Sequence, residues 1–391
     1  MTTTHRKQRT SHHIVVLGAG YTGMFAAIRL AHRTRRTGTR VTLVNPSARF
    51  TERLRLHQTA TGQHLADHRI PDLLTGTGVT FVQGTATALD PEAHTLVLDR
   101  GAATLSYDTL VVALGSATDT GPVPGAAQHA YTLNGREAAG RLAARLDGAG
   151  SVAVCGSGLT GVETATEIAE SHPGLRVTLV GAEEPGALMG DRARAHLRRA
   201  LDRLGVEVRA GARVAKVLPD AVELAGGETL TAEVCVWTAG VRVPALAAEA
   251  GLTVDERGRI VTDPTLRSVS HPSVYAIGDC AAVRMPWGLL HGTCGSGMPT
   301  AQYAADALAR RLRGKEPGPF RYGYVHQAVS LGRRDAVIQF THPDDRPRRA
   351  CLTGRAAVRY KELVSSSPVP FYRLSRRMNV SATLSRAGRA S

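Results

Sequence analysis

The sequence predicts an α/β fold in which one strand–turn–helix–strand unit occurs twice. The apolar run Ile14–Leu17 leads into a glycine-rich turn at Gly18–Gly23, and Val152–Cys155 leads into a matching turn at Gly156–Gly161. Both turns are followed by a helical pattern and then by the tetrapeptide Val-Thr-Leu-Val, at 24–32 and 41–44 in the first copy and at 162–170 and 177–180 in the second. Two copies in matching context predict two Rossmann-type three-layer units.

The glycine spacing at both turns is suited to binding a dinucleotide. Gly18 permits a tight turn, Gly20 lets the backbone approach a pyrophosphate, and Gly23 lets helix and strand pack closely. The following helix presents unpaired N–H groups and a positive potential to the phosphates. The second turn repeats the three glycines as Gly156, Gly158 and Gly161.

The length of 391 residues favours two or three domains. We expect further strands at 80–84, 95–98, 107–115, 234–240 and 274–279, and a helix at 300–313. The predicted division is a disordered tail (1–12), a discontinuous first nucleotide-binding domain (13–125 and 250–318), a second nucleotide-binding domain (126–249), and a small α+β C-terminal segment with a basic tail (319–391).

The chain is strongly basic, with 48 Lys+Arg against 33 Asp+Glu and a net charge of +15. Nearly all of the positive charge is arginine, since lysine occurs only at Lys7, Lys216, Lys315 and Lys361. Only 4% of the residues are aromatic, so no stacking platform for nucleic acid is evident. A solvated arginine-rich surface is the favoured interpretation, and no nucleic-acid partner is predicted.

Five scattered cysteines without a CxxC pair indicate a reducing compartment and no structural zinc. No run approaches the roughly 18 apolar residues of a membrane-spanning helix. The polar N-terminus lacks the apolar stretch of a signal peptide, so a cytoplasmic location is expected. No histidine has a ligand spacing that predicts a metal site; we place His12 and His13 in the N-terminal tail and interpret His57 and His64 as solvated or packed.

The second strand of each unit ends without the acid that often binds the adenosine ribose. Asn45 stands there in the first unit and Gly181 in the second. Asn45 can still hydrogen-bond ribose hydroxyls. Glu183 and Glu184 follow Gly181 with no arginine beside them in the sequence, and they would repel a 2′-phosphate. NADH is therefore favoured over NADPH, with NADPH left open.

The two glycine turns, together with Tyr107–Gly115, Val162-Glu163, Trp237–Gly240 and Tyr275–Asp279, resemble the flavoproteins with two dinucleotide-binding domains. Within these, the chain is most similar to type II NADH:quinone dehydrogenases and apoptosis-inducing-factor-like proteins. The resemblance implies a glutathione-reductase-like arrangement, with FAD on the first unit and NAD(P)H on the second. It places Asp279, Gly115 and Ser116 near the flavin, and Glu163, Ala239 and Gly240 near the nicotinamide nucleotide. The turn residues Tyr21, Thr22, Leu159 and Thr160 belong to the same predicted cofactor sites.

The resemblance also bears on the electron acceptor. Disulfide reductases of this superfamily carry CxxC or CxxxxC beside the flavin, and neither spacing is present. Pro299–Ala304 resembles the helix start that lies against flavin and quinone in type II dehydrogenases, with Gln302 as the matching glutamine. Asp306 stands where a second glutamine is usual, which is a departure from the family. Gln302 and Glu163 are the predicted catalytic residues, and a quinone-like molecule is the predicted acceptor.

Several alternatives remain open at this point. The chain is also compatible with a ferredoxin or rubredoxin reductase, a biosynthetic tailoring flavoenzyme, or a redox-responsive binding protein. The basic segment Pro368–Ser391 carries a few aromatic and apolar residues that could touch anionic lipid, although a solvated or disordered tail is favoured. The residues leave open whether the chain forms a homodimer.

Overall fold

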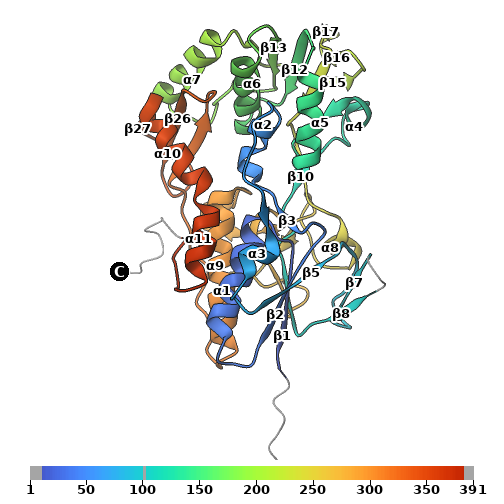
Figure 1. Ribbon diagram of the computed structural model, residues 1–391, viewed down its shortest axis with the longest axis vertical. Helices are drawn as coiled ribbons and strands as arrows, with labels where there is room; N and C mark the ends of the chain where they lie inside the picture. Colours follow the sequence, from blue (N-terminus) through green and yellow to red (C-terminus); the bar gives the residue numbers. More distant parts are fainter. Residues whose placement is uncertain (1–10, 100–102, 383–391) are drawn as a thin grey trace, which may run out of the picture.

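The computed structural model describes residues 11–99 and 103–382 and contains two parallel sheets, one above the other in Figure 1. The first sheet has the order β21-β9-β1-β2-β5 with all strands parallel. Residues 14–16 of β1 are fully buried, as expected for a parallel strand covered on both faces. The strands are β1 (His13–Leu17), β2 (Arg40–Asn45), β5 (Val79–Gln83), β9 (Thr109–Val112) and β21 (Val274–Ala276).

The placement of His12 and His13 in the N-terminal tail is wrong. His13 begins β1, and its ring Nε2 lies 2.8 Å from Thr42 Oγ1 in β2. His12 Nε2 lies 2.9 Å from Thr109 Oγ1 at the start of β9. Both rings are therefore held by neighbouring strands, which is a long-range effect that local polarity does not reveal.

The second sheet repeats the arrangement of the first, with the order β11-β18-β12-β13-β14 and parallel pairing throughout. In each sheet the strand before the glycine turn lies between the strand that follows the helix and a strand from much later in the chain. The elements are β11 (Ala130–Tyr131), β12 (Ser151–Cys155), β13 (Arg176–Val180), β14 (Glu207–Arg209), β18 (Val234–Trp237), α5 (Arg136–Leu146), α6 (Leu159–Ser171) and α7 (Asp191–Arg203).

The two units are connected by more than the chain crossover. A short antiparallel pair, β10 (Ala117–Thr118) with β19 (Val241–Arg242), links them. A segment of the first unit, η1 (Arg53–Arg55) and α2 (Leu56–Thr59), reaches α5 and α6 of the second (Figure 1). Leu56 is buried in the core of the second unit, so this segment is fixed between the two halves.

Small antiparallel sheets and short elements complete the two units. A three-stranded antiparallel sheet is inserted in each unit. No helix within the described ranges is long and apolar enough to cross a bilayer. The three-stranded sheets are β6 (Ala86–Asp90), β7 (Thr95–Leu98), β8 (Thr104–Ser106) and β15 (Val214–Val217), β16 (Ala221–Leu224), β17 (Thr229–Thr231); the short elements are β3 (Arg49–Phe50), β4 (His68–Arg69), α3 (Ile70–Leu74), α4 (Ala126–His129), α8 (Leu246–Glu249), β20 (Ile260–Val261), η2 (Gly278–Cys280), β22 (Ala281–Ala282), β23 (Arg284–Met285) and β24 (Gly288–Leu289).

Helix α9 (Cys294–Arg311) begins six residues before the helix predicted at 300–313. Thr293 and Ser296 form a capping box that starts it early. Pro299 lies inside the helix and cannot donate to the carbonyl of Gly295. The Tyr322 hydroxyl donates to that carbonyl instead, at 3.1 Å, so a residue 27 positions downstream of Gly295 satisfies the carbonyl that Pro299 cannot pair.

The C-terminal segment contains a three-stranded antiparallel sheet and two helices, which run along one side of both units in Figure 1. The solvated-tail interpretation is wrong for 368–375, because these residues form helix α11. Tyr372 is fully buried, and its hydroxyl donates to Tyr21 O at 2.8 Å beside the first glycine turn. The elements are β25 (His326–Ser330), β26 (Ala336–Thr341), β27 (Pro347–Thr353), α10 (Gly354–Ser366) and α11 (Pro368–Ser375).

Charged side chains occupy the contact between α6 and the C-terminal segment. Glu167 of α6 is 0% exposed, accepts a hydrogen bond from Gln63 Nε2, and lies 4.0 Å from Arg333 Nε. Its Oε2 has no hydrogen-bond partner among the residues that the structure describes. Burial raises the pKa of Glu167 to about 7, although Gln63 and Arg333 oppose the shift. The ionised carboxylate is therefore unfavourable at this contact.

We expect Glu167→Gln to make unfolding less dependent on pH. A folded-state pKa of about 7 exceeds the unfolded value of 4.5, so the native protein loses stability as pH rises through this interval. Between pH 5 and pH 8.5 the difference in unfolding free energy should move in favour of the variant by roughly 2.5 kcal/mol. Chemical denaturation at the two pH values measures this, with exposed Glu137→Gln as the control for the amide itself. A difference that does not change with pH would contradict the prediction.

Candidate functional site

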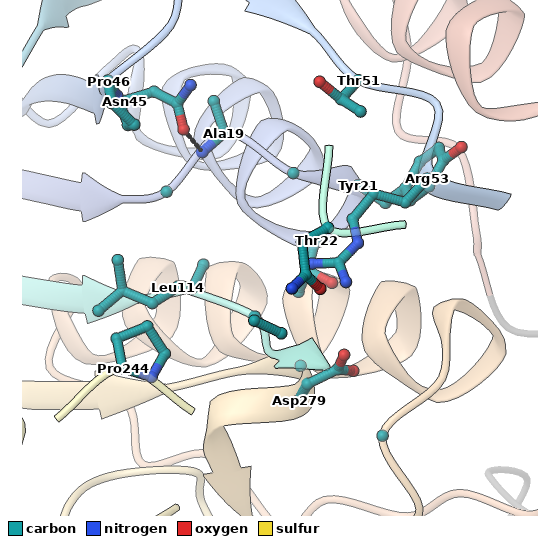
Figure 2. A pocket seen from close by; sticks show the side chains of 18 of the residues that line it. Ala19, Tyr21, Thr22, Asn45, Pro46, Thr51, Arg53, Leu114, Pro244 and Asp279 are labelled. Atoms are coloured by element: carbon teal, nitrogen blue, oxygen red, sulfur yellow. Dashed lines mark hydrogen bonds between the residues drawn. The ribbon is translucent and has the colours of Figure 1, made fainter. Parts of the chain in front are cut away.

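A cavity with a volume of about 650 Å³ lies between the two units. Its wall follows the carboxyl ends of β1, β2, β9 and β21, where parallel α/β sheets bind ligands. Figure 2 shows Tyr21, Thr22, Asn45 and Asp279 around it. The predicted site residues that line it are Gly18, Gly20, Tyr21, Thr22, Asn45, Gly115, Thr160, Glu163, Gly240 and Asp279.

The other predicted site residues do not line this cavity. Three glycines among them are enclosed by backbone, and the rest lie around the second turn or farther away. They are Gly23, Ser116, Gly156, Gly158, Leu159, Gly161, Glu183, Ala239 and Gln302.

The first glycine turn leaves no room for side chains at two of its positions. A Cβ on Gly23 would lie 1.8 Å from Gly18 O, and Gly18 has a φ of +104° with Ala113 O 2.5 Å from its own Cβ position. Gly20 has open space around its Cβ position. It caps α1 (Tyr21–Thr34), and no side chain caps this end. The first backbone amides of α1 are therefore left for a ligand, and the turn fits a pyrophosphate.

The second turn has the same geometry. A Cβ on Gly161 would lie 1.7 Å from Gly156 O, Gly156 has a φ of +126°, and the surroundings of Gly158 are open. The Thr238 hydroxyl donates to Cys155 O and Gly156 O at 3.1 Å and holds the start of the turn. The uncapped N-terminus of α6 then presents its amides to a second dinucleotide.

Asn45 supports the first turn from the end of β2. Its Oδ1 accepts a hydrogen bond from Ala19 N at 2.9 Å, drawn in Figure 2, and its Nδ2 donates to Ser47 O at 2.8 Å. The side chain lines the cavity and also fixes the backbone between the first two glycines.

Asp279 faces the cavity from the 3-10 turn after β21. Its Oδ2 accepts a hydrogen bond from Ser116 Oγ at 2.7 Å, which joins the two segments predicted to meet at the flavin. Arg53 lines the same cavity and donates to Ser116 O. Sequence reasoning missed Arg53, because η1 reaches the cavity only through the tertiary fold. A carboxylate, a guanidinium and two open glycine turns together fit FAD on the first unit and a nicotinamide dinucleotide on the second.

A buried polar cluster forms the wall of the cavity on the side of the second unit. Glu163 of α6 forms an ion pair with Lys361 Nζ of α10 at 2.7 Å. Its Oε1 also accepts hydrogen bonds from Ser330 N at 3.0 Å and Ser330 Oγ at 3.1 Å. Burial alone would raise the pKa of Glu163, but Lys361, His57 and the hydrogen bonds lower it below its ordinary value. Glu163 is therefore ionised at neutral pH.

His57 of α2 completes this cluster. It is 4% exposed, lines the cavity, and its Nε2 lies 3.5 Å from Ser330 Oγ. Burial lowers the pKa of His57 to about 4, so the imidazole is neutral at neutral pH. The sequence interpretation treated His57 only as solvated or packed and did not single out Ser330. The one available signal for Lys361 was its rarity, as one of four lysines in an arginine-rich chain.

The end of β13 explains the missing ribose acid of the second unit. A Cβ on Gly181 would lie 2.0 Å from Ser157 Oγ, so the position admits no side chain. Ser157 Oγ donates to Glu183 O at 2.7 Å. Glu184 forms an exposed ion pair with Arg198 of α7 at 2.8 Å. No arginine stands next to these acids in the sequence, but Arg198 lies beside Glu184 in the folded chain. The expectation that no arginine is near them is therefore wrong.

Gln302 lies in the third turn of α9 and outside the cavity wall. Its Oε1 accepts a hydrogen bond from Ala382 N at 2.6 Å. Asp306, one turn later, forms ion pairs with Arg29 at 2.8 Å and Arg33 at 3.0 Å. The departure noted at Asp306 thus joins α9 to α1.

Comparison with known proteins identifies relatives over most of the chain. Residues 12–307 match the family model of pyridine nucleotide-disulphide oxidoreductases. An NADH dehydrogenase-like protein of Mycobacterium tuberculosis is 34% identical over 83% of this chain and 86% of its own length. A type II NADH:quinone oxidoreductase of Staphylococcus aureus is 28% identical over 91% and 94%.

Solved structures show the same fold. The sulfide:quinone oxidoreductase of Aquifex aeolicus has a TM-score of 0.79 at 19% identity and covers 93% of this chain and 92% of its own. NDH2 of Plasmodium falciparum, solved in complex with NADH, has a TM-score of 0.79 at 15% identity and covers 94% and 97%.

These matches confirm the predicted α/β fold class, the predicted family and the prediction of an oxidoreductase that uses FAD and NADH. The matched residues 12–307 include both open glycine turns and the residues that line the cavity between them. The chain belongs to the pyridine nucleotide-disulphide oxidoreductase family.

Proposed function

We propose that this chain takes hydride from NADH and passes two electrons to a quinone or quinone-like acceptor. The observation that carries the proposal is a single cavity that reaches the first glycine turn at Gly20, the second at Thr160, and the polar cluster at Glu163. The names of the staphylococcal relatives and of the Aquifex structure give quinone as the acceptor of those proteins.

The described cysteines support a quinone rather than a sulfur acceptor. Cys155, Cys235 and Cys280 are buried, and none of the cysteine side chains that the structure describes lines the cavity. Burial raises the pKa of the Cys280 thiol to about 11. A thiol in that state is a poor nucleophile, so these residues do not support disulfide or persulfide chemistry.

Bound FAD would supply the chemistry, by accepting hydride from NADH and returning two electrons to the acceptor. The residues position the two partners. Gly20 and Gly158 let the backbone approach the pyrophosphates, and Asp279 provides an acceptor for hydroxyl groups near Ser116. Glu163, held by Lys361 and Ser330, provides a rigid acceptor where the nicotinamide is expected.

The polar cluster also holds a proton at the cavity wall. Reduction of a quinone by NADH consumes one proton in addition to the hydride. Ser330 Oγ donates a hydrogen bond to Glu163 Oε1, and it lies 3.5 Å from Nε2 of the neutral His57 ring. These side chains shield the site from bulk water, because Glu163, His57 and Ser330 are all buried.

We further propose that α11 and residues 376–378 contact an anionic membrane surface, where quinones reside. Leu374 is 46% exposed and Met378 is 53% exposed. Each follows an exposed arginine in the chain, Arg373 and Arg377 respectively. Apolar side chains among arginines are suited to the headgroup region of a bilayer.

We expect the FAD-loaded protein to be reduced rapidly by NADH and reoxidised rapidly by menadione. Anaerobic stopped-flow absorbance of the flavin measures both half-reactions, and ferricyanide serves as a control acceptor that takes single electrons. Slow reoxidation by menadione together with fast reoxidation by a ferredoxin would contradict the quinone assignment.

Glu163→Gln should slow flavin reduction by NADH by roughly ten- to a hundred-fold, because the nicotinamide loses a fixed partner. The double variant Glu163→Gln/Lys361→Met removes the unpaired ammonium and tests whether the single variant acts only through fold damage. Equal slowing of both half-reactions by Glu163→Gln would assign Glu163 a purely structural role.

NADH should exceed NADPH in kcat/KM, because Glu183 and Glu184 follow Gly181 and would repel a 2′-phosphate, and Arg198 is already paired with Glu184. Arg198→Ala should lower the use of NADPH further, since it leaves Glu184 uncompensated. Arg199→Ala, an exposed arginine of the same helix, is the matched control. A parent enzyme that prefers NADPH would show that Arg198 serves the phosphate rather than Glu184.

A further inference from the structure

A second, smaller cavity lies at the far end of α1 from the first glycine turn. It has a volume of about 170 Å³ and is lined by His32, Arg33, Arg35, Arg36, Arg313 and Asn379. Helix α1 has 14 residues and is therefore about 21 Å long. The cavity is thus separate from the cofactor site.

The charge in this cavity is not balanced by protein groups. No carboxylate lines it. Arg33 forms an ion pair with Asp306, which also receives Arg29. Arg35, Arg36 and Arg313 form no ion pair within the part of the chain that the structure describes. Three exposed arginines therefore line a common space without an anionic partner among the described residues.

The surrounding contacts hold the cavity in shape. Helices α1 and α9 pack side by side (Figure 1), and Arg313 Nη2 donates to Arg33 O at 2.7 Å. Arg29 Nη1 donates to Val380 O at 2.7 Å, which fixes the C-terminal segment beside Asn379. Burial, followed by the charges of Arg35, Arg29 and Arg33, lowers the pKa of His32. Three distant segments thus meet around one positively charged hollow.

We propose that this cavity binds a phosphate dianion, either free phosphate or the phosphomonoester headgroup of a lipid. Guanidinium groups match the geometry and charge of phosphate oxygens, and His32 and Asn379 add neutral hydrogen-bonding groups. The volume is below the roughly 300 Å³ at which pockets for larger organic ligands begin. A single phosphate group fits this chemistry, whereas a second dinucleotide does not.

The test is isothermal titration of the full-length, FAD-loaded protein with inorganic phosphate at constant ionic strength. We expect saturable binding that weakens at least ten-fold in Arg35→Gln/Arg36→Gln. The matched control Arg192→Gln/Arg199→Gln removes two exposed arginines of α7 and should bind phosphate like the parent. Absence of saturable binding, or equal weakening in both double variants, would overturn the proposal.

Vesicles distinguish the two sources of the phosphate. Binding to phosphatidic acid vesicles that is lost in Arg35→Gln/Arg36→Gln and displaced by phosphate supports the lipid headgroup. Phosphate binding without selective binding to phosphatidic acid supports the free anion. Equal binding to phosphatidic acid and phosphatidylglycerol vesicles, unaffected by the variant and by phosphate, would show general charge attraction and exclude the lipid headgroup as the source of the phosphate.

Discussion

The close approach of helix to strand at the two glycine turns is the constraint on which the rest of the structure depends. A Cβ would lie 1.8 Å from a carbonyl oxygen at Gly23 and 1.7 Å at Gly161, so no larger residue permits the same path. This path leaves the N-termini of α1 and α6 uncapped and directed to the same cavity. The local geometry of a few residues thus directs both helix N-termini to one cavity.

The buried charges depend on that frame. Glu163 lies two residues after Gly161, and its partners come from α10, β25 and α2, which are far apart in sequence. A buried carboxylate is tolerated only with such compensation. One turn later Glu167 has weaker partners and a raised pKa. The same helix face therefore carries one fully compensated acid next to the cavity and one poorly compensated acid behind it.

Features set by short spacings were predictable from the sequence, and features set by distant contacts were not. The glycine turns, β7 and the paired strands β2 and β13 follow from patterns a few residues long. The passage of α9 through Pro299 depends on Tyr322, and the order of α11 depends on burial of Tyr372 against Tyr21. His57, Ser330 and Lys361 come together only through the tertiary fold, so no local pattern indicated that they form one cluster.

The two parts of the cavity are held in different ways. The nucleotide turns are held by backbone contacts that admit almost no substitution, whereas the 53–59 segment lines the cavity with side chains and the C-terminal segment lies behind it. His57 and Lys361 reach Glu163 from those two segments. Side chains there can change while both turns keep their geometry. The acceptor should therefore be decided by the segments whose sequence pattern is weakest, which explains why the cofactors were easier to infer than the acceptor.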